Sequence, residues 1–266
     1  MPGMWIRCLK KRPGALLRLF CFPYAGAGPT LFNSWASALP EMVEVSAVQL
    51  PGRGSRLNEP LCRRLDPMVD SICAALVPDL NSPFALFGHS MGAILAFEVT
   101  RALAARSAKA PAHLFMSGRG APHIPSKSRP CFDLSDDEFI AELDRLNGIP
   151  KELLNSREIM SIVLPFVRAD FEATETYEFH AAPRVKSPIT AFGGIGDRHV
   201  SREALEGWKD HTDSSFKLRM FPGDHFFIQS MEKLFLRMLY EDLLQTCRGI
   251  PPSDRSEYHP SRSGLV

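Results

Sequence analysis

Residues 84–92 of the chain, FALFGHSMG, are its most informative stretch. Residues 84–87 are a short apolar run of the kind that forms a buried strand, and the apolar segment 93–104 predicts a buried helix. Between them, Gly88-His89-Ser90-Met91-Gly92 has the pattern G-x-S-x-G. A strand, this pentapeptide and a helix together form a nucleophile elbow, which exposes Ser90 at the carboxyl end of a sheet. A glycine-rich turn with a capping serine is the alternative, and we weigh it less.

Short apolar runs and helical segments alternate on both sides of this elbow. The runs predict strands at residues 16–22, 43–50, 113–116, 188–192 and 216–221, and the spacing of apolar residues predicts helices at 66–80, 202–209 and 231–247. Residues 134–179 show helical periodicity and no strand pattern. This order predicts an α/β fold with a mostly parallel central sheet and helices on both faces. We expect residues 1–120 and 181–249 to form the core, 121–180 to be a helical insertion above the sheet, and 250–266 to be a disordered tail.

Composition and charge exclude several classes of protein. The chain has 266 residues, of which 45% are hydrophobic and 23% charged, so a disordered protein is excluded. Its 31 Lys and Arg balance 30 Asp and Glu to a net charge of +1, which gives no bulk attraction for nucleic acid or an anionic membrane. No apolar stretch is long enough to predict a membrane span. No interface segment stands out, so we expect a monomer.

The cysteines and the N-terminus indicate where the protein works. Six cysteines are scattered along the chain without a C-x-x-C motif or zinc-ligand spacing, which predicts no metal site and a reducing, cytoplasmic location. Residues 10–22 resemble a signal peptide, with basic residues before an apolar run. The run is short, Arg18 interrupts it and Pro23 ends it, so we interpret it as a buried strand.

A serine nucleophile needs a base and an acid that orients the base. After a nucleophile elbow, the chain order of these groups is Ser, Asp or Glu, then His. Asp197 follows the predicted strand 188–192, and His225 follows the predicted strand 216–221, so both lie at the carboxyl edge of the sheet. We predict Asp197 as the acid and His225 as the base. The alternatives are His199 and His211 for the base, and Asp224 for the acid.

A tetrahedral intermediate also needs hydrogen-bond donors for its oxyanion. One expected donor is the backbone N–H of Met91, directly after the nucleophile. The other comes from the loop after an early strand, which here is the small, glycine-rich segment 22–28, FPYAGAG. By position we favour the N–H of Ala25, and an ordinary turn is the alternative.

Seven segments of the chain together resemble the type II thioesterases, the stand-alone thioesterases that accompany nonribosomal peptide and polyketide synthases. They span roughly residues 15–247, and the combination of F-P-Y-A-G, L-P-G-R-x-x-R and R-A-D-F is more specific than G-x-S-x-G. The chain departs mildly from the family at Asn147-Gly148, where two glycines are common, and in its tail after about Arg248. The segments are residues 20–28 (FCFPYAGAG), 50–60 (LPGRGSRLNEP), 84–92 (FALFGHSMG), 117–122 (SGRGAP), 146–150 (LNGIP), 164–177 (LPFVRADFEATETY) and 221–227 (FPGDHFF).

The resemblance implies an α/β-hydrolase fold and hydrolysis of acyl or aminoacyl thioesters on the phosphopantetheine arm of an acyl or peptidyl carrier protein. It implies an editing role that clears stalled groups from a synthase. It makes Ser90, Asp197 and His225 the catalytic triad, Ala25 and Met91 the oxyanion donors, and the helical insertion a mobile lid. No metal or redox cofactor is implied, and the partners are carrier proteins.

The resemblance also suggests residues that contact the substrate. Tyr24, Arg53 and Arg56 are candidates, the two arginines for the phosphate of the phosphopantetheine arm. Ordinary ion pairs are the interpretation that we favour for both arginines. The alternative function is a general carboxylesterase or lipase-like serine hydrolase of the same fold. A non-catalytic scaffold for carrier proteins and an acyltransferase are further alternatives.

Overall fold

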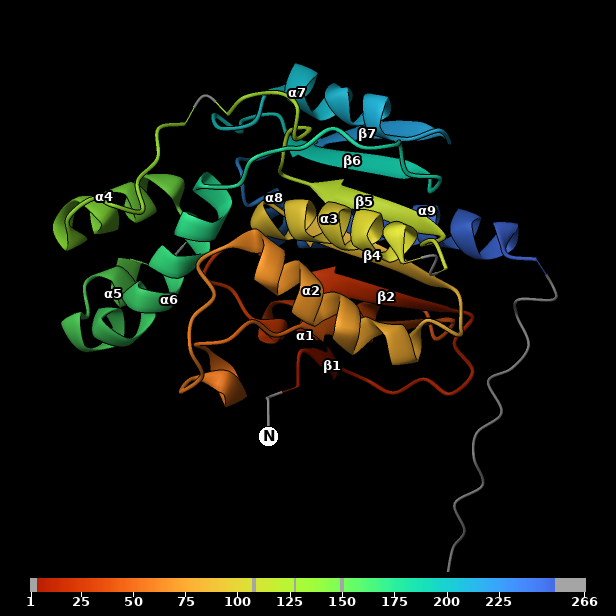
Figure 1. Ribbon diagram of the computed structural model, residues 1–266, viewed down its shortest axis with the longest axis horizontal. Coiled ribbons are helices and arrows are strands. Elements are labelled where there is room, and N and C mark those ends of the chain that lie inside the picture. Colours follow the sequence, from red (N-terminus) through yellow and green to blue (C-terminus); the bar gives the residue numbers. More distant parts are fainter. Residues whose placement is uncertain (1–3, 107–108, 127, 149–150, 252–266) are drawn as a thin grey trace, which may run out of the picture.

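The computed structural model describes residues 4–106, 109–126, 128–148 and 151–251 (Figure 1). Most of the predicted tail, residues 252–266, lies outside the described residues. The strands are Ile6–Cys8 (β1), Leu17–Phe22 (β2), Val43–Val48 (β3), Phe84–His89 (β4), His113–Ser117 (β5), Ile189–Gly194 (β6) and Phe216–Phe221 (β7). The α-helices are Asn33–Ala38 (α1), Leu65–Leu76 (α2), Met91–Ala105 (α3), Asp136–Leu146 (α4), Lys151–Leu154 (α5), Arg157–Glu175 (α6), Arg202–Glu206 (α7), Phe227–Ser230 (α8) and Glu232–Gly249 (α9).

The strands form one seven-stranded sheet in the order β1-β3-β2-β4-β5-β6-β7. Every pairing is parallel except that of β1 with β3, so the predicted mostly parallel sheet is confirmed. Strand β1 and helix α1 were not predicted. Both are short, and β1 is a three-residue edge strand with two exposed residues, so it lacks the apolar run that marks the inner strands.

Helices cover both faces of the sheet, because successive side chains of each strand point to opposite sides. In the central strand β4, Phe84 and Leu86 pack with residues of α2 and α3, whereas Ala85 and Phe87 pack with residues of α1 and α9. Strand β4 is buried along its whole length, as a central parallel strand must be. The elbow that follows it is therefore anchored in the buried centre of the sheet.

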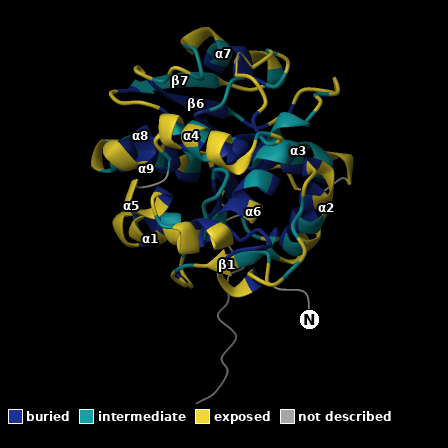
Figure 2. Cartoon of the chain, turned by 90° about the vertical axis from the view of Figure 1, so that its left-hand side faces the viewer, coloured by how far each residue is buried: buried dark blue, intermediate teal, exposed yellow. Residues whose placement is uncertain are grey.

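The stretch between β5 and β6 forms helices α4, α5 and α6, and its described residues contain no strand. These helices share a small core of their own, which includes Phe139, Leu143 and Leu164. Helix α4 begins with a capping box between Ser135 and Glu138. The three helices lie together beyond one end of the sheet, away from the helices that cover its faces (Figure 1). Their outward surfaces on α4 and α5 are exposed (Figure 2).

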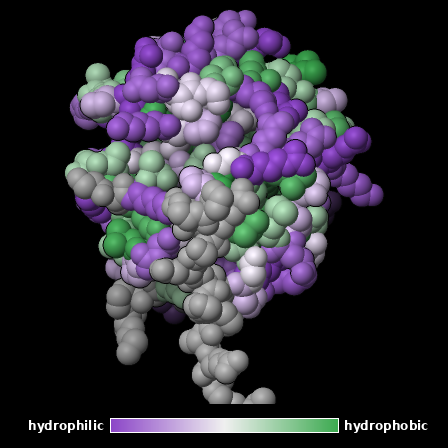
Figure 3. Space-filling model, turned by 90° about the vertical axis from the view of Figure 1, so that its right-hand side faces the viewer, coloured by the Kyte–Doolittle hydropathy of each residue, from purple (hydrophilic) through white to green (hydrophobic). Residues whose placement is uncertain are grey.

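The C-terminal end and the opposite surface complete the fold. Helix α9 ends at Gly249, and Ile250, which the sequence analysis assigned to the tail, is buried with an exposure of 5%. The surface opposite α4–α6 is largely hydrophilic, with small scattered hydrophobic groups (Figure 3). Within the described ranges, no helix has the length and apolar character needed to cross a membrane.

Candidate active site

Ser90 lies in a strained turn between β4 and α3. Its backbone has φ 55° and ψ −116°, a conformation that non-glycine residues rarely adopt. The turn is held by a hydrogen bond from the Ser90 N–H to the carbonyl of Ser117 on β5, at 2.8 Å. Strain of this kind is typical of a nucleophile elbow. Ser90 itself is half-buried, whereas the residues on either side of it are buried.

The two glycines of G-x-S-x-G permit close backbone contacts. A Cβ atom on Gly88 would lie 2.1 Å from the carbonyl oxygen of Gly92, and one on Gly92 would lie 2.1 Å from the carbonyl oxygen of Phe22. Any side chain at either position would push the start of α3 away from β4 or from the end of β2. The motif therefore places the Ser90 turn directly against the loop that follows β2.

The structure brings His225 and Asp197 together at the carboxyl ends of β6 and β7. His225 Nδ1 lies 2.7 Å from Asp197 Oδ2, and the His225 residue is only 9% exposed. Asp197 Oδ1 accepts backbone N–H bonds from His199 at 2.8 Å and Val200 at 3.2 Å. Burial raises the pKa of the Asp197 carboxyl, but the hydrogen bond and charge interaction with His225, together with the two backbone N–H bonds, outweigh it, so its pKa lies below the usual value. Asp197 is thus a fixed carboxylate that orients the His225 imidazole.

The alternative base and acid residues have other partners. His199 contributes its backbone N–H to Asp197, and its ring lies 6.1 Å from that of His225. His211 pairs with His123 at 2.6 Å. Asp224 accepts the backbone N–H of Phe226 at 2.9 Å, so its carboxylate caps the turn before α8. The carboxylate that His225 engages is that of Asp197.

The loop after β2 packs against the elbow and contains backbone donors without an acceptor among the described residues, those of Tyr24, Ala25 and Gly28. The N–H of Gly26 donates to Asp170 Oδ2 at 2.8 Å, and the N–H of Ala27 donates to the Tyr24 carbonyl at 3.0 Å. Among the described residues, none accepts a hydrogen bond from the Ala25 N–H. Met91 is the first residue of α3, where backbone N–H groups have no partner within the helix. The assignment of Ala25 and Met91 as the oxyanion donors stays a prediction.

Tyr24 belongs to this loop and packs against the segment that follows His225. Its ring contacts Phe226 and His89 edge-to-face, with centroids 5.0 and 5.8 Å apart, and its hydroxyl accepts a hydrogen bond from Gln229 at 2.9 Å. Burial raises the pKa of the Tyr24 hydroxyl, against a smaller opposite effect of the Gln229 bond. Tyr24 is therefore a neutral packing group of the site, and its predicted contact with substrate stays a prediction.

Both predicted arginines form ion pairs, the interpretation favoured from the sequence. Arg56 is 2% exposed, pairs with Glu59 at 2.7 Å and lies over the ring of Trp5. Arg53 is 6% exposed and makes two bonds to Asp170, at 2.6 and 2.8 Å. Asp170 is the aspartate of the R-A-D-F segment, and the sequence did not predict it as a site residue. The signal that could have found it is a carboxylate on the otherwise apolar buried face of α6.

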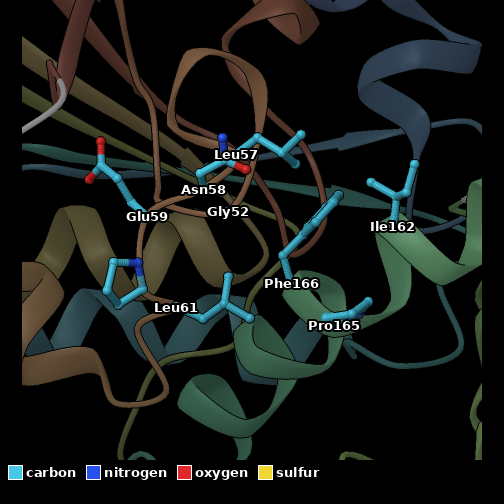
Figure 4. Close-up of a pocket in the computed structure, with 9 residues that line it drawn as sticks. Gly52, Leu57, Asn58, Glu59, Leu61, Ile162, Pro165 and Phe166 are labelled. Atoms are coloured by element: carbon cyan, nitrogen blue, oxygen red, sulfur yellow. The ribbon is translucent and has the colours of Figure 1, made fainter.

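A cavity of about 400 Å³ lies between the loop 52–61 and helix α6 (Figure 4). Leu57 and Leu61 line it from the loop, and Ile162, Pro165 and Phe166 line it from the helix. The ring of Phe166 also covers the Arg53 guanidinium, whose central carbon is 4.8 Å from the ring centroid. None of the predicted site residues lines this cavity.

In the part of the chain that the structure describes, no group of three or more His, Cys, Asp or Glu side chains is placed to hold a metal ion.

Comparisons with known proteins agree with this fold. The thioesterase domain family matches residues 17–243. The gramicidin S biosynthesis protein GrsT of Aneurinibacillus migulanus is 40% identical over 239 residues, which are 90% of this chain and 93% of GrsT. The structure of BorB, a type II thioesterase from the borrelidin biosynthetic cluster, has a TM-score of 0.83 at 34% identity and covers 91% of this chain and 98% of BorB. RedJ, a thioesterase of the prodiginine pathway in Streptomyces coelicolor, has a TM-score of 0.81 at 38% identity, over 87% of both chains.

The chain therefore belongs to the thioesterase family, with the α/β-hydrolase fold. Within that family it is a type II thioesterase, an enzyme that hydrolyses thioesters.

Proposed function

We propose that this protein hydrolyses acyl and aminoacyl thioesters on the phosphopantetheine arm of carrier proteins, through a covalent intermediate on Ser90. The observation that carries the proposal is the pairing of His225 with Asp197 at 2.7 Å, together with the strained elbow at Ser90, whose preceding residue His89 has its ring 5.1 Å from that of His225. A histidine oriented by a carboxylate is the base that a serine hydroxyl needs to become a nucleophile.

The first half of the reaction forms an acyl-enzyme. His225 Nε2 takes the proton of Ser90 Oγ as this oxygen attacks the thioester carbonyl carbon. The resulting oxyanion accepts hydrogen bonds from the backbone N–H groups of Ala25 and Met91. The carbon–sulfur bond then breaks, the sulfur takes the proton from His225, and the phosphopantetheine thiol leaves. Asp197 stays ionised throughout and stabilises the imidazolium.

The second half of the reaction releases the acid. His225 takes a proton from water, whose oxygen attacks the ester carbonyl on Ser90, and the same two N–H groups hold the second oxyanion. Collapse of this intermediate returns the proton from His225 to Ser90 Oγ and frees the carboxylic acid. Each step balances without a metal or a redox cofactor, because the only groups transferred are an acyl group and protons.

The proposed partner and role rest on the relatives. GrsT is named for gramicidin S biosynthesis, and BorB and RedJ come from the borrelidin and prodiginine pathways. We propose that this protein likewise acts beside a nonribosomal peptide or polyketide synthase in the cytoplasm, as a monomer. There it would remove stalled or mis-primed groups from acyl or peptidyl carrier domains. Helices α4–α6 would then be the lid through which the carrier-bound arm enters.

The test is release of acyl groups from loaded carrier protein. Acetyl-, hexanoyl- and aminoacyl-carrier protein are incubated with the wild type and with Ser90→Ala, and intact mass follows the loss of each group. We expect release by the wild type and a decrease on the order of 10³-fold or more in the variant. Hydrolysis of soluble esters with no release from any carrier would instead indicate a general carboxylesterase.

A further inference from the structure

A buried ion pair joins helix α6 to the oxyanion loop, residues 23–28. Arg53 and Asp170 are 6% and 1% exposed, and two hydrogen bonds link them. Asp170 Oδ2 also accepts the N–H of Gly26 at 2.8 Å, and Arg53 Nη1 donates to the carbonyl of Ala27 at 3.1 Å. The pair therefore holds the loop by one donor and one acceptor of its backbone.

These contacts fix the peptide next to the proposed oxyanion donor. The Gly26 N–H belongs to the same planar peptide unit as the Ala25 carbonyl, so the bond to Asp170 sets the orientation of that unit. Gly26 has φ +83°, and a Cβ atom added there would lie 3.0 Å from Val167 Cγ2, so the backbone of the loop passes close to α6 at this residue. The N–H groups of Gly26 and Ala27 are engaged, whereas those of Tyr24, Ala25 and Gly28 have no acceptor among the described residues. Of these three, the Ala25 N–H belongs to the peptide unit directly before the one that Asp170 holds.

We infer that Asp170, held by Arg53, is a positioning residue that sets the Ala25 N–H for oxyanion binding. Because Asp170 belongs to α6, the oxyanion loop has its reactive geometry only while this helix of the insertion is seated on it. The inference rests on the proposed function, since it assumes that Ala25 binds the oxyanion. A purely structural ion pair is the competing explanation, and the two make opposite predictions for a pair of variants.

The distinction comes from the energetics of buried ion pairs. Removing one partner leaves a buried charge unpaired and destabilises strongly, whereas replacing both partners by apolar residues of similar size is often neutral or stabilising. Asp170→Asn leaves Arg53 without its counter-charge but keeps an oxygen that can accept the Gly26 N–H. The double variant Arg53→Met/Asp170→Leu removes the charges together and removes that acceptor as well.

If Asp170 positions the loop, the variant with the lower stability should be the one that keeps more activity. We expect Asp170→Asn to have the lower Tm and the smaller loss of kcat. We expect the double variant to have the higher Tm of the two and a loss of kcat of about 10- to 100-fold, below the 10²- to 10³-fold expected for complete loss of an oxyanion donor. KM should stay within about 3-fold in both, since the contact acts in the transition state.

The experiment measures kcat, KM and Tm of the full chain with a soluble acyl thioester of N-acetylcysteamine. It also measures inhibition by an acyl trifluoromethyl ketone, which forms an oxyanion on the serine, and by the matching non-electrophilic thioether. We expect ketone affinity to fall by the same factor as kcat, and thioether affinity to stay unchanged.

Asp242→Asn is the matched control, because Asp242 is a buried carboxylate paired with Arg219 and Lys217 on the α9–β7 contact. Asp242→Asn should lower Tm, and the ratio of ketone affinity to thioether affinity should stay at its wild-type value.

Three results would overturn the inference. They are wild-type kcat in the double variant, activity that follows Tm across the variants, and an equal loss of ketone and thioether affinity. Ser90→Ala is assayed in parallel to separate this outcome from a failure of the proposed function. If Ser90→Ala retains turnover, the proposed function fails and the inference falls with it. If Ser90→Ala is inactive and the Asp170 variants, like Asp242→Asn, lower Tm without changing the ratio of ketone to thioether affinity, only the inference about Asp170 is wrong.

Discussion

The substitution Gly92→Ala should move the start of α3 away from the loop after β2, and so separate the two proposed oxyanion donors. A Cβ at Gly92 would lie 2.1 Å from the Phe22 carbonyl oxygen and 2.7 Å from that of Pro23, whereas Cβ contacts below 3.0 Å essentially do not occur. The start of α3, which carries Met91, must therefore move about 0.9 Å from the loop that carries Ala25. Both obstacles are backbone atoms, so no side chain can turn aside to absorb the change.

A shift of this size removes one donor from the oxyanion. Productive donors lie about 2.7–3.1 Å from the oxyanion position, and loss of one costs about 10²- to 10³-fold in kcat. We expect a decrease in kcat of at least about 10²-fold, together with roughly 1–3 kcal/mol of destabilisation from overpacking. The assay is steady-state hydrolysis of an acyl thioester, with Tm measured on the same samples.

The matched control is Gly249→Ala at the end of α9. A Cβ at Gly249 meets no atom within 4 Å, so kcat should be unchanged and Tm unchanged or slightly higher. Wild-type kcat and Tm in Gly92→Ala would refute the reasoning, because the elbow would then tolerate a side chain that the geometry excludes.

Two further predictions concern the acid and the pH dependence of stability. Asp197→Asn should lower kcat on the order of 10³- to 10⁴-fold, because His225 loses the carboxylate that orients it, whereas Asp224→Asn should change kcat less than about tenfold; equal losses in steady-state assays would contradict the assignment. Burial lowers the pKa of His113 from 6.5 to about 4, so between these values the unfolded chain binds a proton that the folded protein does not. The contribution of His113 to stability is present above about pH 6.5 and is lost as the pH falls toward about 4. Tm measured across this range should fall less steeply in His113→Gln than in the wild type, and parallel curves would disprove the effect.

The sequence predicted the parts of the site that local pattern determines. Ser90 follows from the glycine spacing, because Gly88 and Gly92 permit backbone contacts that no other residue allows. Asp197 and His225 follow from topology, because the carboxyl ends of neighbouring parallel strands meet at one edge of the sheet. The structure places these two side chains in contact, as that reasoning requires.

Long-range pairing was less predictable. Arg53 and Asp170 are far apart in the chain, and their contact depends on how α6 of the insertion packs on the loop after β3, which no periodicity encodes. The same holds for strand β1, whose three residues pair antiparallel with β3 without an apolar run of their own. The two arginines were predicted to favour ion pairs, but only the structure could identify their partners.

The most direct test of the central claim is to find the acyl-enzyme. The wild type is mixed with hexanoyl-carrier protein, quenched with acid within milliseconds to seconds, digested and examined by mass spectrometry. We predict a hexanoyl ester on the peptide that contains Ser90, which forms and then decays as hexanoic acid appears. Hydrolysis that proceeds with no acyl group on Ser90, or with the group on a cysteine, would contradict the account.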